Sequence, residues 1–341
     1  MSTQPTPGPV TQPGLATASA HSPLAYFGFA WFVPVMGWIG LTLAWFQSPR
    51  EESGLSVVTQ LASLLSVALF ALVFIAQVLR AWRHPHTLLS DLRHPVRMAF
   101  TASLAIALVL MSTLGTLWGW ADDPWVQAIW WAGSLIEFSI TVWVLSRILR
   151  PADAGGLTWP AITPLLAIPI VGNVLVPLAG LRWPFSGWLS AQFGLGVFLW
   201  PLIVGLVLVR LLQAGPLPAR MTPTLFILVA PPSAIGLVLL QWPAPPSLAW
   251  ACWGVALMFL LWALSQWRVI GRLTFGMPHW GMSFPLAAFS ALCLRLAQLP
   301  EGHWLLLPGQ FALWITTGVI LWLSVKSLQG LLDGRLLQPE G

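Results

Sequence analysis

The sequence predicts an all-α integral membrane protein of ten transmembrane helices, and its composition is the first reason. Of the 341 residues, 57% are hydrophobic and only 7% are charged, and the mean hydropathy is +0.80. A soluble domain carries roughly 25% charged residues. This chain therefore has too few charges for a water-soluble surface. Its 23 tryptophans suit the headgroup level of a bilayer, where amphipathic rings concentrate.

Apolar segments long enough to cross a bilayer, which takes about 20 residues, are the second reason. The predicted spans are 24–46, 55–79, 98–120, 126–148, 159–181, 187–210, 222–241, 248–267, 275–298 and 306–328. The loops between them are short, so residues 23–330 form one predicted membrane domain. Residues 1–22 are rich in Pro, Thr, Ser and Gly and hold no Lys or Arg. They lack the basic start of a signal peptide and are predicted to be a disordered cytoplasmic tail, with 331–341 as a second cytoplasmic tail.

The placement of positive charge is the third reason. Twelve of the fifteen Lys and Arg residues fall in the loops after the even spans or in the C-terminal segment. They are Arg80, Arg83, Arg93, Arg97, Arg147, Arg150, Arg210, Arg220, Arg268, Arg272, Lys326 and Arg335. Cytoplasmic loops carry the excess of Lys and Arg. Both termini are therefore predicted in the cytoplasm and the protein in the plasma (inner) membrane, which requires an even number of spans.

Prolines separate the odd spans from the even ones. Leaving aside the first few residues of spans 159–181 and 306–328, the odd spans contain Pro34, Pro164, Pro169, Pro177, Pro223, Pro231, Pro232, Pro278 and Pro285, whereas Pro201 alone falls in the interior of an even span. Proline removes a backbone donor, and in hydrocarbon the freed carbonyl needs a partner found only in a bundle interior or beside water. The alternation favours five helical hairpins, with an inner ring of odd helices and an outer ring of even ones. The third span breaks the pattern, since Pro95 lies only at its start.

Five segments, all on odd spans, resemble one known family. They are YFGFAWFVPVMGWIGLTLAWF (26–46), HPVRMAF (94–100), TPLLAIPIVGNVLVPLAG (163–180), LPARMTPTLFILVAPPSAIGL (217–237) and MPHWGMSFPLAAFSALCLRLA (277–297). In this order and spacing they are similar to the bacterial tellurite-resistance/dicarboxylate-transporter family, which includes the plant slow anion channels. The match extends over nearly the whole membrane region.

The resemblance implies a central pore through each protomer, a homotrimer and passive flow of small inorganic or organic anions. It also implies a gate, a phenylalanine on the ninth helix that matches Phe284, beside Pro285. A bulky ring in a narrow pore blocks ions by steric closure and dewetting. Family members differ in substrate. The sequence does not choose among chloride, nitrate, dicarboxylates, sulfite and tellurite.

Other site candidates accompany this gate. The candidates for pore lining or helix breaks are Phe27, Gly28, Pro34, Pro169, Asn173, Pro231 and Pro285. Arg97 and Arg220 are candidates for a vestibule that concentrates anions, and the alternative is that both only follow the charge rule or snorkel. For Asn173, structural hydrogen bonding is favoured over pore lining.

Two ionisable residues inside spans have competing interpretations. Glu137 is the acidic residue deep within a span, and such residues are functional candidates by default. It lies on an even span, so an interhelical hydrogen bond is favoured over proton coupling. His279 precedes Phe284 and could titrate near neutral pH, but a packed, satisfied histidine is favoured.

Other function classes find little support. The chain has no GxGxxG, Walker, HExxH or GxSxG motif, so no enzyme activity, cofactor or metal site is predicted. Cys252 and Cys293 lie in apolar segments and are read as structural thiols. The scattered arginines do not form a nucleic-acid surface. A proton-coupled transporter of an oxyanion or C4-dicarboxylate is the closest rival to a channel, and a membrane scaffold without flux is the third hypothesis.

Overall fold

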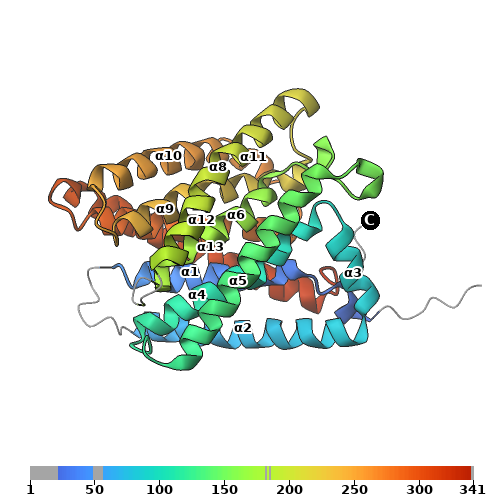
Figure 1. Cartoon of the computed structure of the whole chain (residues 1–341), viewed down its shortest axis with the longest axis horizontal. Coiled ribbons are helices and arrows are strands. Elements are labelled where there is room, and N and C mark those ends of the chain that lie inside the picture. Colours follow the sequence, from blue (N-terminus) through green and yellow to red (C-terminus); the bar gives the residue numbers. More distant parts are fainter. Residues whose placement is uncertain (1–21, 49–56, 181–182, 184–185, 339–341) are drawn as a thin grey trace, which may run out of the picture.

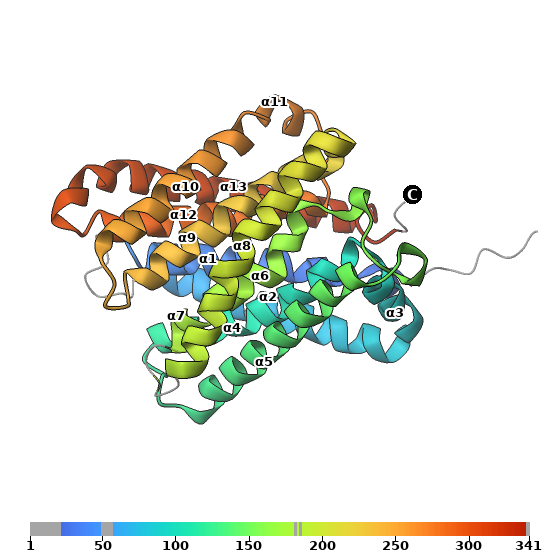
Figure 2. The same ribbon diagram turned by 45° about the horizontal axis from the view of Figure 1, so that its top comes forward.

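A computed structural model describes residues 22–48, 57–180, 183 and 186–338, and within these ranges every regular element is a helix. Long helices are packed together in one bundle and run obliquely to one another (Figures 1 and 2). The predicted all-α class is confirmed. Most of the predicted tail 1–22, together with Arg50 and Arg182, lies outside the described residues. The last helix continues to Leu332, two residues into the predicted C-terminal tail.

Each even span of the prediction corresponds to one long, continuous α-helix, and these are called the outer helices. They are α2 (Val57–Arg83), α5 (Pro124–Ser146), α8 (Ser186–Ala214), α10 (Pro246–Leu264) and α13 (Leu306–Leu332). Among them, α8 has a proline, Pro201, in its interior.

Each odd span is instead divided into a 3₁₀ stretch followed by an α-helix, and these are called the inner segments. They are η2 (Phe29–Trp31) with α1 (Phe32–Trp45), η3 (Arg97–Thr101) with α4 (Ala102–Leu117), η7 (Pro164–Ala167) with α6 (Ile168–Leu175), η8 (Ala219–Val229) with α9 (Ala230–Leu239), and η9 (Met277–Met282) with α12 (Ser283–Leu296). All five inner segments change from 3₁₀ to α-helix, although their sequences differ. The change is therefore a shared feature of the inner segments.

Short elements connect these helices. They are η1 (Pro23–Tyr26), α3 (Pro85–Arg93), η4 (Arg147–Leu149), η5 (Ala152–Ala154), η6 (Trp159–Ala161), α7 (Pro177–Gly180), α11 (Trp267–Ile270) and η10 (Pro300–Leu305).

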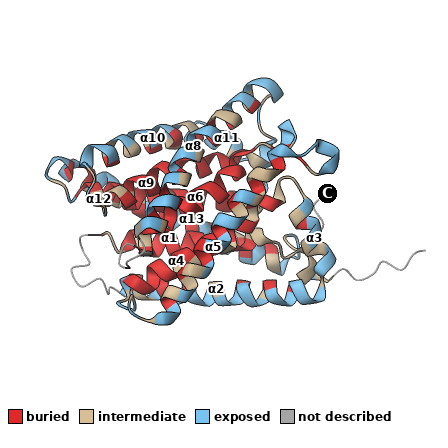
Figure 3. Cartoon of the chain, in the orientation of Figure 1, coloured by how far each residue is buried: buried red, intermediate tan, exposed pale blue. Residues whose placement is uncertain are grey.

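Burial divides the helices into the same two groups. In the inner segments Arg97–Leu117 and Ala219–Leu239, 78% and 89% of the most apolar stretch is buried, whereas the corresponding figures for the outer helices run from 22% to 33%. Figure 3 shows buried residues gathered on the central helices and exposed ones on α2, α8 and α10. An apolar side chain gains nothing by leaving lipid, so exposed apolar faces of this kind suit a bilayer.

Seven helices of the described chain are long and apolar enough to cross a membrane, and Phe29–Trp45 and Pro164–Ala179 are shorter apolar helices. The chain is thus a multi-pass membrane protein. The count of ten crossings and their arrangement as five hairpins remain predictions, although a helix occupies each of the ten predicted spans.

Prolines occupy the first turns of the inner α-helices. Pro34 is the third residue of α1, Pro169 the second of α6, Pro231 the second of α9 and Pro285 the third of α12. In a first turn the missing N–H removes no intrahelical bond, and the fixed φ suits the helix. These prolines therefore start α-helices after 3₁₀ stretches without the loss of a backbone hydrogen bond. The third inner segment makes the same change at Ala102 without a proline.

Hydrogen bonds from tryptophan N–H groups connect the last outer helix, α13, to two of the inner segments. Trp38 and Trp45 of α1 donate to Ser324 (3.1 Å) and Thr317 (3.3 Å) of α13, and Trp280 donates to Ser327 (2.8 Å). In lipid, where water cannot satisfy these donors, hydrogen bonds between helices help to fix their register.

Candidate functional site

A small apolar cavity lies where the 3₁₀ stretches of the inner segments meet their α-helices. All five inner segments contribute to its wall, and no outer helix does. The lining residues are Val33, Met36, Phe100, Leu165, Ile168, Val171, Thr224, Ile227, Ala230, Met277, Pro278, Trp280, Gly281, Phe284 and Pro285. The cavity holds about 30 Å³, which is about the space of one water molecule. Five separate parts of the chain thus enclose one narrow space.

The lining offers almost no fixed polarity. None of its side chains is charged, the hydroxyl of Thr224 donates to the carbonyl of Met221 (2.6 Å), and the Trp280 N–H is directed to Ser327. A narrow, apolar constriction excludes ions by dewetting until it widens. The cavity in this structure is therefore a narrow, apolar constriction.

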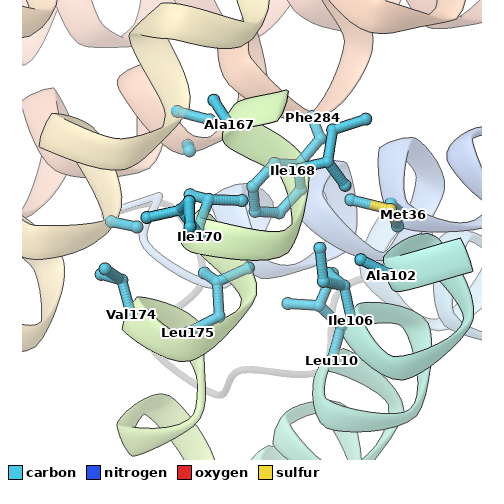
Figure 4. Packing of buried hydrophobic residues seen from close by; sticks show 14 of the residues in the cluster. Met36, Ala102, Ile106, Leu110, Ala167, Ile168, Ile170, Val174, Leu175 and Phe284 are labelled. Atoms are coloured by element: carbon cyan, nitrogen blue, oxygen red, sulfur yellow. The ribbon is translucent and has the colours of Figure 1, made fainter. Parts of the chain in front are cut away.

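Phe284 projects into this cavity from the junction of η9 and α12. Its side chain is 5% exposed, and it packs beside Ile168 of α6, with Met36 of α1 nearby (Figure 4). The backbone of α1 approaches its ring closely, since a Cβ added at Gly40 would lie 2.8 Å from the Cδ2 atom of Phe284. The ring fits only because position 40 has no side chain.

A charged cluster lies at the start of η3. Asp91 accepts a hydrogen bond from Arg80 at 2.6 Å and pairs with Arg97 at 3.2 Å, and the side chains of Arg80 and Asp91 are 2% and 8% exposed. Arg97 remains 37% exposed. Arg220, at the start of η8, is exposed, and no ion pair of Arg220 occurs among the described residues. Both vestibule candidates thus begin inner segments that reach the cavity.

Comparison with known proteins identifies the family. The sequence pattern of the voltage-dependent anion channel family, SLAC1, matches residues 26–328. The chain belongs to the SLAC1 family. Two uncharacterized transporters of Methanocaldococcus jannaschii are 23% and 26% identical, over 78% and 77% of this chain and 83% and 81% of their own lengths. A putative malic acid transport protein of Schizosaccharomyces pombe is 25% identical over 64% of this chain and 53% of its own length.

The resemblance found in the sequence is therefore confirmed, and with it the coarse function. This SLAC1-family chain is a membrane transporter of anions, and its family consists of channels and transporters, not enzymes.

Several sequence candidates in this SLAC1-family chain lie away from the cavity. Phe27 stacks on Trp31 with ring centroids 4.8 Å apart, and Gly28 lies beside the Asp91 carboxylate. The amide of Asn173 donates to the Thr141 hydroxyl of outer helix α5 (2.7 Å) and to the carbonyl of Pro169 in its own helix, α6 (2.8 Å). Pro285 lines the cavity, whereas Pro34, Pro169 and Pro231 adjoin the lining residues Val33, Ile168 and Ala230.

Glu137 lies behind the cavity wall. It is fully buried on α5, and its carboxyl lies directly against Gly172 of α6, where any added Cβ would overlap it. Neither carboxyl oxygen has a hydrogen-bond partner among the described residues, so the interhelical hydrogen bond favoured from sequence is not formed. His279 is buried and contacts Gly276 through Nδ1 at 3.1 Å, as a packed, satisfied histidine would.

Gly40→Ala is expected to couple energetically to Phe284. The new Cβ forces the ring out of place, and overpacking of this kind costs about 1–3 kcal/mol. In a Phe284→Ala background the cost should disappear, which gives a coupling energy of similar size in a double-mutant cycle. Thermal unfolding of the four purified proteins measures it.

Gly318→Ala on α13 is the matched control, because nothing lies within 4 Å of its Cβ position. Equal destabilisation by Gly40→Ala in both backgrounds would mean that the ring of Phe284 does not occupy this position.

Proposed function

We propose that this protein conducts small anions passively through a pore formed by the five inner segments, and that Phe284 closes it. One observation carries the proposal: a cavity lined by all five inner segments and by no outer helix, with Phe284 in its wall. Its volume of about 30 Å³ leaves no room for a hydrated anion beside the ring.

The proposed conduction depends on weak binding. An ion that is held tightly does not leave, and the lining has no charged side chain. The 3₁₀ stretches bring backbone dipoles to the same junctions, where they can offer partial positive charge without a trap. Such a pore selects for anions mainly through the potential at its ends.

Anion flux through purified protein in planar bilayers tests the proposal. We expect current to follow voltage, to keep rising with anion concentration, and to gain nothing from an imposed pH gradient. Chloride, nitrate and malate, tested in turn, give the selectivity. Flux that saturates at low substrate and is driven by protons would replace the channel with a coupled transporter.

We propose that Arg97 and Arg220 raise the anion concentration at the pore mouth. Arg97→Gln should lower the current more at low ionic strength than at high, because salt screens exposed charges over about 10 Å at 0.1 M. Currents recorded at two salt concentrations on the same protein measure this. A loss of current that is equal at both concentrations would indicate a folding defect.

A proton-coupled transporter is the second candidate, and Glu137 favours it. A buried carboxyl without a hydrogen-bond partner inside a membrane helix is a functional candidate by default, and it lies against α6, which also contributes Ile168 and Val171 to the cavity lining.

Glu137→Gln separates the two candidates. Glutamine keeps the shape of the neutral side chain, and no hydrogen bond is lost. We expect unchanged currents with and without a pH gradient. If the wild-type protein responds to the gradient and Glu137→Gln does not, the coupled mechanism is correct.

The proposed assembly is a homotrimer in the plasma membrane, with both termini in the cytoplasm. The outer helices carry exposed large apolar residues, such as Leu72, Phe198 and Leu307, which suit either lipid or a neighbouring copy. Native mass spectrometry of the purified protein gives the number of copies.

A further inference from the structure

A second, larger pocket lies at the start of η3, the inner segment that contributes Phe100 to the cavity wall. It has a volume of about 440 Å³ and is lined by His86, Leu89, Ser90, Arg93, His94 and Arg97. The residues come from α3 and from the turn into η3. Five of the six side chains can donate a hydrogen bond, and two of them are guanidinium groups. The pocket is therefore built to receive an anion.

The nearest carboxylate does not neutralise the pocket. Asp91 is held by Arg80 through Oδ2 at 2.6 Å and by Arg97 through Oδ1 at 3.2 Å. Within the described part of the chain, no carboxylate pairs with Arg93, and the Nε atom of Arg97 is buried without a hydrogen-bond partner. The single charge of Asp91 thus cannot balance the three guanidinium groups of Arg80, Arg93 and Arg97, which leaves positive charge for a ligand.

The pocket is also held in shape before any ligand arrives. The carbonyl of Arg93 accepts a hydrogen bond from Arg147 of η4 (2.9 Å). Nδ1 of His94 accepts the backbone N–H groups of Val96 and Arg97, both at 3.1 Å. In neutral His94 the ring proton is therefore on Nε2, so this nitrogen is a donor. A rigid frame lowers the entropic cost of binding.

Size and position indicate what kind of anion fits. A volume of about 440 Å³ lies in the range of organic ligand sites and far exceeds a halide. Guanidinium pairs suit phosphate because they offer two parallel donors each. Most of the lining residues belong to α3, and α3 lies beside the end of α2 (Figure 1). Trp82 in α2 is 78% exposed, as tryptophans are at a membrane interface.

We propose that this pocket binds a phosphate-bearing anion, in the first place the headgroup of an acidic phospholipid. The acyl chains would then lie along the exposed apolar face of α2, which includes Ile75, Val78 and Leu79, while Leu89 covers the edge of the headgroup. Basic pockets next to membrane helices recognise such headgroups. The ligand would tie α3 to the membrane beside the start of η3, which leads to the gate.

Lipid binding to the delipidated full-length protein in detergent tests the proposal. Native mass spectrometry measures bound phosphatidylglycerol, phosphatidylcholine and inorganic phosphate on wild type, Arg93→Gln, His86→Gln and Arg268→Gln. We expect phosphatidylglycerol to bind and phosphatidylcholine not to. Arg93→Gln should weaken binding about tenfold or more, since a charged hydrogen bond contributes about 1.5–3 kcal/mol. Arg268→Gln, an exposed arginine of α11 outside the pocket, should bind as wild type does.

The outcomes separate the sources of the phosphate. If inorganic phosphate binds with the same dependence on Arg93 and phosphatidylglycerol does not, the ligand is a free phosphate compound. Equal binding of phosphatidylglycerol to wild type, Arg93→Gln and His86→Gln overturns the proposal. His86 is exposed, so its substitution keeps the test valid if Arg93→Gln does not fold. Because the readout is binding, a failure of the proposed conduction would leave this result unaffected.

Discussion

Phe284→Ala is expected to raise the steady anion current at least about tenfold, which corresponds to lowering the barrier by about 1.4 kcal/mol. The substitution removes the ring from a cavity that holds only about 30 Å³ and lies among all five inner segments. A wider lining admits water, and a wetted apolar constriction no longer excludes ions. Current in planar bilayers at fixed voltage, normalised to the amount of reconstituted protein, is the measurement.

Phe289→Ala is the control for this experiment. Phe289 lies on the same helix, is 6% exposed and does not line the cavity. Both substitutions remove a buried ring, which typically costs about 3–5 kcal/mol of stability, but only Phe284→Ala should raise the current. If both variants lose stability and neither gains current, Phe284 is a packing residue and the gate is elsewhere.

The two layers of the fold could largely be predicted from sequence, and one inner segment shows where the prediction ends. Prolines are costly in lipid-exposed helices, so their placement marked the four inner segments that contain Pro34, Pro169, Pro231 and Pro285. The segment from Arg97 to Leu117 has the same 3₁₀-to-α change without any proline. Packing against its neighbours sets that junction, and packing partners are not visible in a local sequence.

The site was predictable in part, and for a similar reason. Phe284 was identified through the family resemblance. Its contact with Gly40 could not be predicted, because that contact depends on how α1 and α12 pack against each other. Glu137 was expected to form a hydrogen bond, yet it lies against Gly172, which offers no side chain. The ion pairs of Asp91 could have been predicted, because Asp91 is the one acidic residue among the arginines of segment 80–97.

Asp91→Asn is expected to destabilise the protein by about 3–5 kcal/mol, the usual effect of removing one partner of a buried ion pair. Arg80 is 1% exposed and donates to Asp91 (2.6 Å) and, through Nε, to the carbonyl of Ala25 (3.0 Å). Its guanidinium cannot lose its proton, so asparagine leaves a buried charge without a counterion. Thermal unfolding in detergent, followed by size-exclusion chromatography, measures the loss.

Asp333→Asn is the matched control for the Asp91 experiment. Asp333 pairs with Arg335 at 2.5 Å, but these side chains are 53% and 69% exposed, and exposed pairs contribute only about 0–1 kcal/mol. Replacing both partners of the buried pair, as in Arg80→Met with Asp91→Leu, should recover most of the stability, because no fully buried charge is left unpaired; Arg97, which also loses Asp91, is 37% exposed. Equal, small shifts for Asp91→Asn and Asp333→Asn would mean that water reaches Arg80 and that α3 is not held to α2 by this pair.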